Sequence, residues 1–179
     1  MSKNIVVLNG SPRKCGNTEI LTDAFVEGVK EAGHTVVKFN VAKMKINGCI
    51  DCKHCFTHKG ECAQKDEMQE IYKALYKADM LVFASPIYWW GFSAQLKAVI
   101  DRMFVNETKP LPIKFSALLL VCADTDAAVA EPVISQYKKI IGYTGWKDVG
   151  IIVQKGVSNK GDIIGHKSLV EARELGRNI

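Results

Sequence analysis

Residues 4–18, NIVVLNGSPRKCGNT, place a short run of β-branched and aliphatic residues directly before a turn of small and polar residues. An amphipathic segment from about Thr18 to Ala32 follows and closes on Gly33, which predicts a strand, a loop and a helix in succession. The same order recurs along the chain, with strands predicted in HTVVKFNV, MLVFAS, FSALLLVCA and DVGIIV and helices near residues 66–78, 93–103, 127–141 and 167–175. Continuous apolar strands alternating with helices predict an α/β fold, a doubly wound five-stranded parallel sheet with helices on both faces.

The chain has 179 residues, is 47% hydrophobic and carries a formal net charge of +5. This size favours one domain over residues 1–179, and no linker or low-complexity tract divides the chain. The first apolar run, Ile5–Leu8, is too short for a signal peptide, and no run approaches membrane-spanning length, so we expect a cytoplasmic protein with no membrane partner. The lysines are dispersed, so nucleic-acid binding is not expected; they suit an anionic small molecule, an acidic electron-transfer partner or simply a solvated surface.

The loop after the first predicted strand is suited to an anion. It lacks both the G-x-G-x-x-G pattern of dinucleotide sites and the G-K-[ST] of a P-loop. It offers backbone N–H groups, the hydroxyls of Ser11 and Thr18, the Asn17 amide, the Arg13 guanidinium and a helix N-terminus, which together predict a site for a terminal phosphate. The alternative is an ordinary loop capped by Asn17 or Thr18, with Arg13 exposed to solvent.

The loop after the third predicted strand, SPIYWWGF, is rich in aromatic residues. Tyr88, Trp89 and Trp90 are consecutive there, next to Pro86 and Phe92, at the edge where ligands of open parallel sheets bind. A flat, amphipathic ring system would explain such a loop, because aromatic faces and backbone amides can hold its two sides and its polar edge. An oligomer interface formed by Trp89 and Trp90 is the alternative, and both interpretations can hold together.

Two segments, GSPRKCGNT and SPIYWWGFSAQLKAVIDR, resemble the flavin-binding segments of the NADPH-dependent FMN reductase family in the flavodoxin-like superfamily. The resemblance extends to about residue 125 and implies a single flavodoxin-like FMN-binding domain. It implies that FMN is held at its phosphate by Ser11, Arg13, Asn17 and Thr18 and along its isoalloxazine by Pro86, Ile87, Tyr88 and Trp89. A weaker match in CADTDAA, which lacks the usual glycines, adds Asp124 and Thr125. No side-chain catalyst is expected, because the flavin supplies the redox chemistry.

Residues 49–62, CIDCKHCFTHKGEC, contain four of the six cysteines, Cys49, Cys52, Cys55 and Cys62. They lie in a loop, residues 47–65, that is inserted after the second predicted strand. Their spacing differs from the paired knuckles of zinc ribbons and is similar to that of iron–sulfur flavoproteins in the same superfamily, which implies thiolate ligands of a [4Fe–4S] cluster near FMN. Redox-active or disulfide-forming thiols come next as an interpretation, and structural zinc comes last. The other two cysteines, Cys15 and Cys122, are predicted to be small packing residues.

Two classes of function fit this sequence. The first is an FMN-dependent oxidoreductase, supplied with electrons by NAD(P)H or a ferredoxin and acting on a flavin, a quinone or another small acceptor. The second is a non-enzymatic flavodoxin-type electron carrier, although the basic charge and the cysteine loop favour the enzyme. The exposed aromatic residues predict a homodimer or homotetramer, because so large an apolar cluster is costly to leave in water.

Overall fold

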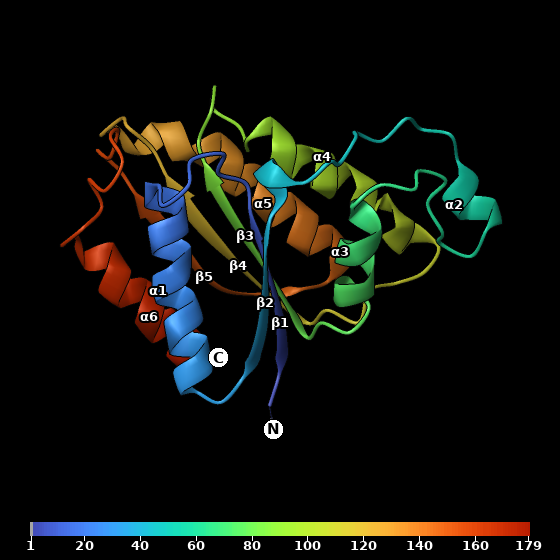
Figure 1. The fold of residues 1–179 in the computed structure, drawn as a ribbon, viewed down its shortest axis with the longest axis horizontal. Helices are drawn as coiled ribbons and strands as arrows, with labels where there is room; N and C mark the ends of the chain where they lie inside the picture. The colour runs from blue at the N-terminus through green and yellow to red at the C-terminus, as the bar shows by residue number, and fades with distance from the viewer. Residues whose placement is uncertain (1) are drawn as a thin grey trace.

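The computed structural model describes residues 2–179 and contains one five-stranded sheet (Figure 1). The strands are β1 (Asn4–Asn9), β2 (Thr35–Asn40), β3 (Met80–Pro86), β4 (Phe115–Val121) and β5 (Lys147–Gln154). They pair in parallel in the order β2-β1-β3-β4-β5. The predicted five-stranded parallel sheet is therefore confirmed. The strand order reverses at β1, which places the switch point of the sheet between β1 and β3.

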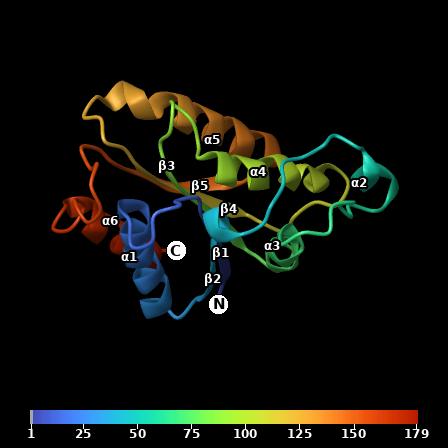
Figure 2. The same ribbon diagram turned by 45° about the horizontal axis from the view of Figure 1, so that its top comes forward.

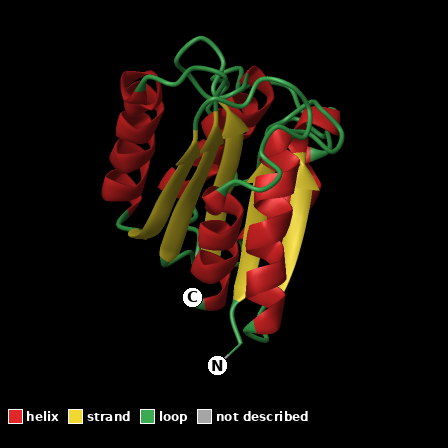
Figure 3. Cartoon of the chain, turned by 90° about the vertical axis from the view of Figure 1, so that its left-hand side faces the viewer, coloured by secondary structure: helices red, strands yellow, loops and turns green. Residues whose placement is uncertain are grey.

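Helices cover both faces of the sheet, as Figures 2 and 3 show. One face packs against α1 (Asn17–Glu31) and α6 (Lys167–Arg177), and the other against α3 (Met68–Leu75), α4 (Ala94–Arg102) and α5 (Glu131–Thr144). The short helix α2 (His54–Thr57) stands apart from the sheet. The chain also forms three short 3-10 helices within residues 2–179, namely η1 (Val41–Lys43), η2 (Met103–Glu107) and η3 (Ala127–Ala130). Over residues 2–179, no helix is both long and apolar enough to cross a membrane.

The five strands separate two apolar cores by simple alternation. In β1, Ile5 and Val7 are buried against α1 and α6, whereas Val6 and Leu8 are buried against the helices of the opposite face. Strand β3 is buried along its whole length. A parallel strand covered on both faces has no solvent-facing side, so its sequence is apolar throughout rather than alternating.

Two predicted helices have boundaries that differ from the expected ones. The helix expected from Asp66 begins at Met68, because the Asp66 carboxylate accepts the Met68 N–H at 3.2 Å while it also pairs with Arg102. The helix expected over 127–141 is divided into η3 and α5, and Pro132 lies in the first turn of α5. Proline suits that position because the first-turn N–H groups have no partner within the helix.

Helices α1 and α6 pack with almost no space between their backbones. A Cβ atom added to Gly28 would overlap the carbonyl oxygen of Arg173, and one added to Gly176 would overlap that of Phe25. The Glu31 carboxylate accepts hydrogen bonds from Arg173 Nε at 2.9 Å and Arg177 Nε at 3.1 Å. These hydrogen bonds lower the pKa of the Glu31 carboxyl to about 2, and the one from Arg173 has the largest effect.

This close approach gives a test of the fold. Gly28→Ala should lower the free energy of unfolding by about 1–3 kcal/mol, because the added methyl group forces α6 away from α1. Gly142→Ala in α5 is the matched control, since no atom lies within 4 Å of the added Cβ. It should be neutral or stabilising by up to about 1 kcal/mol, as alanine favours helix. Denaturant unfolding of both variants measures the difference, and equal effects would contradict the close packing of α1 on α6.

Candidate functional site

The loops that follow β1, β3 and β4 meet at the carboxyl edge of the sheet (Figure 3). Between them lies a cavity of about 200 Å³. The residues that line it are Ser11, Arg13, Asn17, Thr18, Pro86, Ile87, Tyr88, Val121, Cys122, Ala123, Val157 and Ser158. Seven of the residues predicted from two separate loops are thus brought to one cavity at the switch point of the sheet.

The loop after β1 is held open toward this cavity by its own hydrogen bonds. The Ser11 N–H donates to Asn9 Oδ1 at 3.0 Å, and the Arg13 N–H donates to Ser11 Oγ at 3.3 Å. Helix α1 then begins at Asn17 with Gly16 as its N-cap residue, and no side chain accepts from its first N–H groups. The interpretation that Asn17 or Thr18 caps this helix is therefore wrong. The uncapped N–H groups and the helix dipole favour an anion here.

A loop after β5 forms a wall of the cavity that the sequence did not predict. Arg13 Nη1 donates to the Ser158 carbonyl at 2.6 Å, and Asn17 Nδ2 donates to the Asn159 carbonyl at 2.8 Å. Asn17 Oδ1 accepts the Gly161 N–H at 3.0 Å. Asn17 therefore both lines the cavity and anchors this loop. The signal that was overlooked is glycine spacing, because Gly156, Gly161 and Gly165 all adopt positive φ angles between 72° and 89°.

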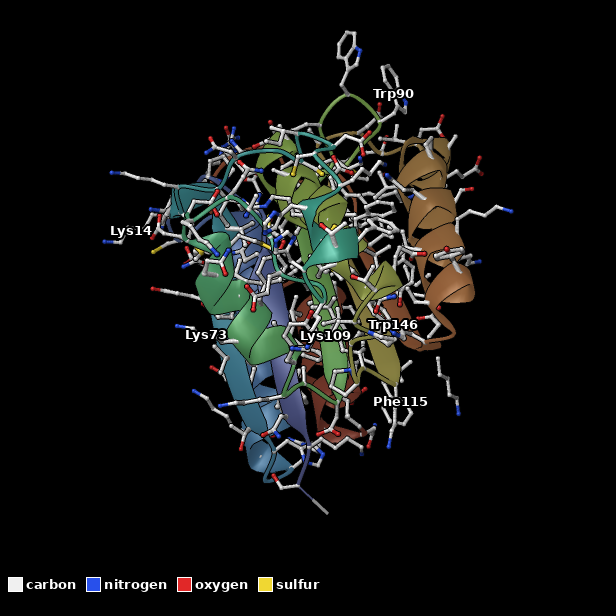
Figure 4. The ribbon with its side chains drawn as sticks, turned by 90° about the vertical axis from the view of Figure 1, so that its right-hand side faces the viewer. Lys14, Lys73, Trp90, Lys109, Phe115 and Trp146 are labelled. Atoms are coloured by element: carbon white, nitrogen blue, oxygen red, sulfur yellow. The ribbon has the colours of Figure 1, made fainter. Side chains whose placement is uncertain are left out.

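The aromatic loop after β3 is a tight hairpin. Tyr88 and Gly91 exchange backbone hydrogen bonds of 3.1 and 3.0 Å, and between them Trp89 and Trp90 have φ angles of +51° and +57°. Non-glycine residues rarely adopt this conformation, and each costs of order 1–3 kcal/mol. Trp89 is 92% exposed, and Trp90 lies at the outer end of the molecule (Figure 4). Phe92 belongs instead to the apolar core, where its ring packs near Phe83.

Of the two weaker candidates after β4, Asp124 lies near the cavity and Thr125 does not line it. Asp124 lines an open hollow beside the cavity, together with Ile87, Trp89, Trp90, Cys122, Ala123 and Val129. Thr125 lines neither this hollow nor the cavity. Cys122 is buried, as predicted for a packing residue, but Cys15 is exposed with φ +51°, so the packing role predicted for Cys15 is wrong.

The four clustered cysteines line one small hollow of about 30 Å³. All four are free thiols; Cys49 and Cys52 are exposed, whereas Cys55 and Cys62 are half-buried. Burial raises the pKa of the Cys55 thiol, and the neighbouring cysteines add to this effect. No three His, Cys, Asp or Glu side chains within residues 2–179 are arranged to hold a single metal ion. A cubane cluster differs in this respect, because each thiolate binds a different iron and the sulfurs stand further apart.

The backbone around these cysteines has several positive φ angles. Asp51 and Lys53 have φ of +51° and +56°, and Lys59 precedes Gly60 with +51° and +81°. Such conformations persist only where the surrounding structure enforces them. In this segment they let the chain reverse direction repeatedly, so that cysteines separated along the sequence line the same hollow.

Helix α4 lies between the two regions. Its N-cap residue, Ser93, follows the aromatic hairpin, and its last residue, Arg102, lines the cysteine hollow. Nine residues of helix rise roughly 13 Å. The cavity and the cysteine hollow have no lining residue in common. Within one chain, the cysteine segment therefore lies at the opposite end of α4 from the cavity, and the expectation that its cluster lies near FMN is not met within a single chain.

A doubly wound sheet with this strand order and an anion-suited cavity at its switch point defines a flavodoxin-like fold. The chain belongs to the NADPH-dependent FMN reductase family, whose sequence model matches residues 3–143. The family resemblance and the fold predicted from the sequence are both confirmed. Membership makes the protein an oxidoreductase that works with FMN.

Similar proteins include several iron–sulfur flavoproteins. One from Archaeoglobus fulgidus is 34% identical over 171 residues, which cover 95% of this chain and 76% of the relative. One from Methanocaldococcus jannaschii is 35% identical over 111 residues, but the match covers only 62% of this chain and 54% of the relative. Among solved structures, an NAD(P)H:quinone oxidoreductase from Methanothermobacter marburgensis has a TM-score of 0.78 at 21% identity, covering 99% and 97% of the two chains, and supports the fold.

The strained hairpin generates a prediction. Replacing Trp89 and Trp90 together by Asn and Gly should raise the free energy of unfolding by about 1–3 kcal/mol, because Asn-Gly adopts two successive positive φ angles readily. The matched control, Trp89→Phe with Trp90→Phe, keeps both aromatic rings and the strain and should show no gain. Chemical denaturation of flavin-free protein is the measurement, at protein concentrations where light scattering shows a monomer, because subunit association would add to the apparent stability. A loss of stability in the Asn-Gly variant would mean that the indoles stabilise the chain itself.

Proposed function

We propose that this protein is an FMN-dependent oxidoreductase that takes electrons from NAD(P)H or from a ferredoxin-like protein and passes them to a small acceptor such as a quinone or a free flavin. The observation that carries the proposal is the cavity at the switch point, where an uncapped helix N-terminus and a guanidinium meet an apolar wall. We further propose that residues 1–179 act as one FMN-binding domain, with residues 47–65 as an insertion after β2.

The polar side of the cavity suits the phosphate of FMN. Ser11, Asn17 and Thr18 are buried, and the backbone N–H groups at the start of α1 have no side-chain acceptor. Arg13 is exposed and anchored by its Nη1 to the Ser158 carbonyl, which leaves its other donors for an anion. We therefore propose that Ser11, Arg13, Asn17 and Thr18 hold the phosphate, while Asn17 also supports the loop after β5.

The apolar side suits the ring system of FMN. Pro86, Ile87 and Tyr88 line the cavity, and Trp89 lines the adjoining hollow with Asp124. The Ile87 N–H already donates to the Val121 carbonyl at 2.9 Å, which fixes the hairpin at its base. We propose that these residues lie around the isoalloxazine, whereas the contact implied for Thr125 has no support in the structure, because Thr125 lines neither hollow. When bound, FMN supplies the hydride and electron chemistry, and the chain orients it and limits access to it.

Arg13 is the residue to test first. Arg13→Ala should weaken FMN binding by about 1.5–3 kcal/mol, a rise in Kd of roughly 10- to 150-fold, because a charged hydrogen bond is lost. Lys14→Ala is the matched control, since Lys14 is exposed in the same loop and points away from the fold (Figure 4). Fluorescence titration of apoprotein with FMN measures both affinities. Equal Kd values for Arg13→Ala and the parent would remove Arg13 from the site.

The electron donor is open to a direct assay. Steady-state oxidation of NADH and NADPH by the FMN-loaded protein, with a quinone or free flavin as acceptor, tests the oxidoreductase proposal. Turnover with either nucleotide supports a nicotinamide donor. If neither nucleotide supports turnover but a reduced ferredoxin reduces the bound FMN, the protein belongs to the ferredoxin-linked class.

We propose that Cys49, Cys52, Cys55 and Cys62 ligate a [4Fe–4S] cluster that exchanges electrons with FMN. The proposal is supported by the shared hollow, by the four free thiols and by the iron–sulfur flavoproteins among the relatives. Within residues 2–179, the cysteine side chains are not arranged to hold a single ion such as zinc. Assembly of the proposed cluster is therefore tested with iron and sulfide together.

Anaerobic reconstitution decides the role of the cysteines. We expect about four irons per chain and an EPR signal in the dithionite-reduced protein. Cys52→Ala should abolish or strongly reduce iron incorporation. Cys15→Ala, which removes an exposed cysteine outside the segment, is the matched control and should incorporate iron like the parent. Equal iron content in the two variants would contradict the cluster and favour redox-active thiols.

We also propose that the subunits associate as a homodimer or homotetramer through Trp89 and Trp90. The support is the exposure of both indoles at the end of a rigid hairpin. Light scattering at micromolar concentration should give more than one chain per particle, and the Asn-Gly hairpin variant should shift the population toward monomer.

A further inference from the structure

Arg102 is an unusual residue in this structure because it is a charged side chain with only 1% of its surface exposed. Its guanidinium donates through Nη1 to Asp66 Oδ2 at 2.5 Å and to the Asn47 carbonyl at 3.3 Å. Through Nη2 it donates to Cys62 Sγ at 3.3 Å and to the Gln64 carbonyl at 3.4 Å. A guanidinium is taken out of water only at a high cost, so this set of acceptors must repay it.

The acceptors of Arg102 lie at both ends of the cysteine segment. Asn47 precedes the first cysteine, whereas Cys62, Gln64 and Asp66 lie at its end. One planar side chain therefore closes the loop, and Asp66 strengthens the closure by accepting the Asn47 N–H at 3.0 Å. A lysine could not make the same contacts, because its ammonium is a point charge without the fixed fork of arginine.

Arg102 is itself held in place from behind. The Tyr72 hydroxyl, on α3, donates to the Arg102 backbone carbonyl at 2.8 Å, and both residues are buried. The last donor of the guanidinium, Nε, is buried and has no hydrogen-bond partner among the described residues. A buried donor without a partner costs about 1–3 kcal/mol. The side chain also lines the hollow that the four cysteines share.

We propose that Arg102 is a positioning residue that arranges the cysteine segment for its cluster and raises the cluster's reduction potential through its charged hydrogen bond to Cys62 Sγ. This inference rests on the cluster under the proposed function. One-electron reduction adds a negative charge to the cluster and its thiolates. A buried cation that donates to a ligand sulfur stabilises that charge, so reduction becomes easier.

Asp66 provides a second test, because its loss should shift the reduction potential in the opposite direction to the loss of Arg102. Its carboxylate neutralises much of the charge of Arg102, and although burial acts in the opposite direction, the hydrogen bond from Arg102 lowers the pKa of Asp66. Removing the carboxylate charge while keeping its shape should expose the cluster to more of the positive charge. Asp66→Asn should therefore raise the reduction potential, whereas loss of Arg102 should lower it.

The test is an EPR-monitored redox titration of the anaerobically reconstituted, FMN-loaded protein. Arg102→Gln should shift the cluster midpoint potential to a more negative value, and Asp66→Asn to a more positive one. Lys59→Gln is the matched control, because Lys59 is an exposed cation in the same segment that does not line the cysteine hollow and donates to no sulfur. Solvent screens that charge, so the shift should be much smaller. A midpoint potential for Arg102→Gln equal to that of Lys59→Gln, or a negative shift for Asp66→Asn, would overturn the tuning role.

The positioning role is tested without a cluster. Hydrogen exchange of cluster-free protein should show faster exchange over residues 47–66 in Arg102→Lys, with unchanged exchange in β1 and β3. If Arg102→Gln folds poorly, the double variant Arg102→Gln with Asp66→Asn replaces the ion pair by two neutral amides. Unchanged exchange in Arg102→Lys would overturn the positioning role. Failure of the parent protein to assemble a cluster would count against the proposed function and not against the positioning role of Arg102.

Discussion

The contact between Gly10 and Ser93 fixes the loop after β1 relative to the loop after β3. Ser93 Oγ donates to the Gly10 carbonyl at 2.8 Å, and the Ser93 N–H donates to Ser85 Oγ at 3.0 Å. A Cβ atom on Gly10 would lie 2.5 Å from Ser93 Oγ and 2.7 Å from Leu96 Cβ, so only glycine fits. This contact joins the end of β1 to the start of α4 across the switch point, and it places the loop after β1 opposite the loop after β3.

Helix α4 connects the Gly10–Ser93 contact to the cysteine hollow. Ser93 Oγ also accepts the Leu96 N–H at 3.4 Å and so caps the helix, while Arg102 at the other end closes the cysteine loop. The helix side that bears Leu96 and Val99 is fully buried against the sheet, which leaves little freedom for its ends to move. The cavity and the cysteine hollow are therefore both positioned by α4, which is itself fixed by its packing on the sheet.

Strain is concentrated in the loops rather than in the sheet. All six non-glycine residues with positive φ in residues 2–179 lie in the loop after β1, the aromatic hairpin and the cysteine segment, and they are Cys15, Asp51, Lys53, Lys59, Trp89 and Trp90. Backbone strain of this kind survives where a scaffold enforces it, and it is common where ligands bind. In this protein the parallel sheet and the two helical layers supply the scaffold.

The alternation of strands and helices could be predicted from the sequence, because apolar periodicity and turn residues act locally and a strand such as β3 is apolar along its whole length. The sequence also indicated the loops after β1 and β3 and the four cysteines, since these are compact motifs. Only the tertiary structure brought Ser158 to Arg13, and Arg102 to Asn47, Cys62 and Asp66, because those partners are 36 to 145 positions apart along the chain. Contacts of that range depend on strand order and helix packing, which local propensity does not encode.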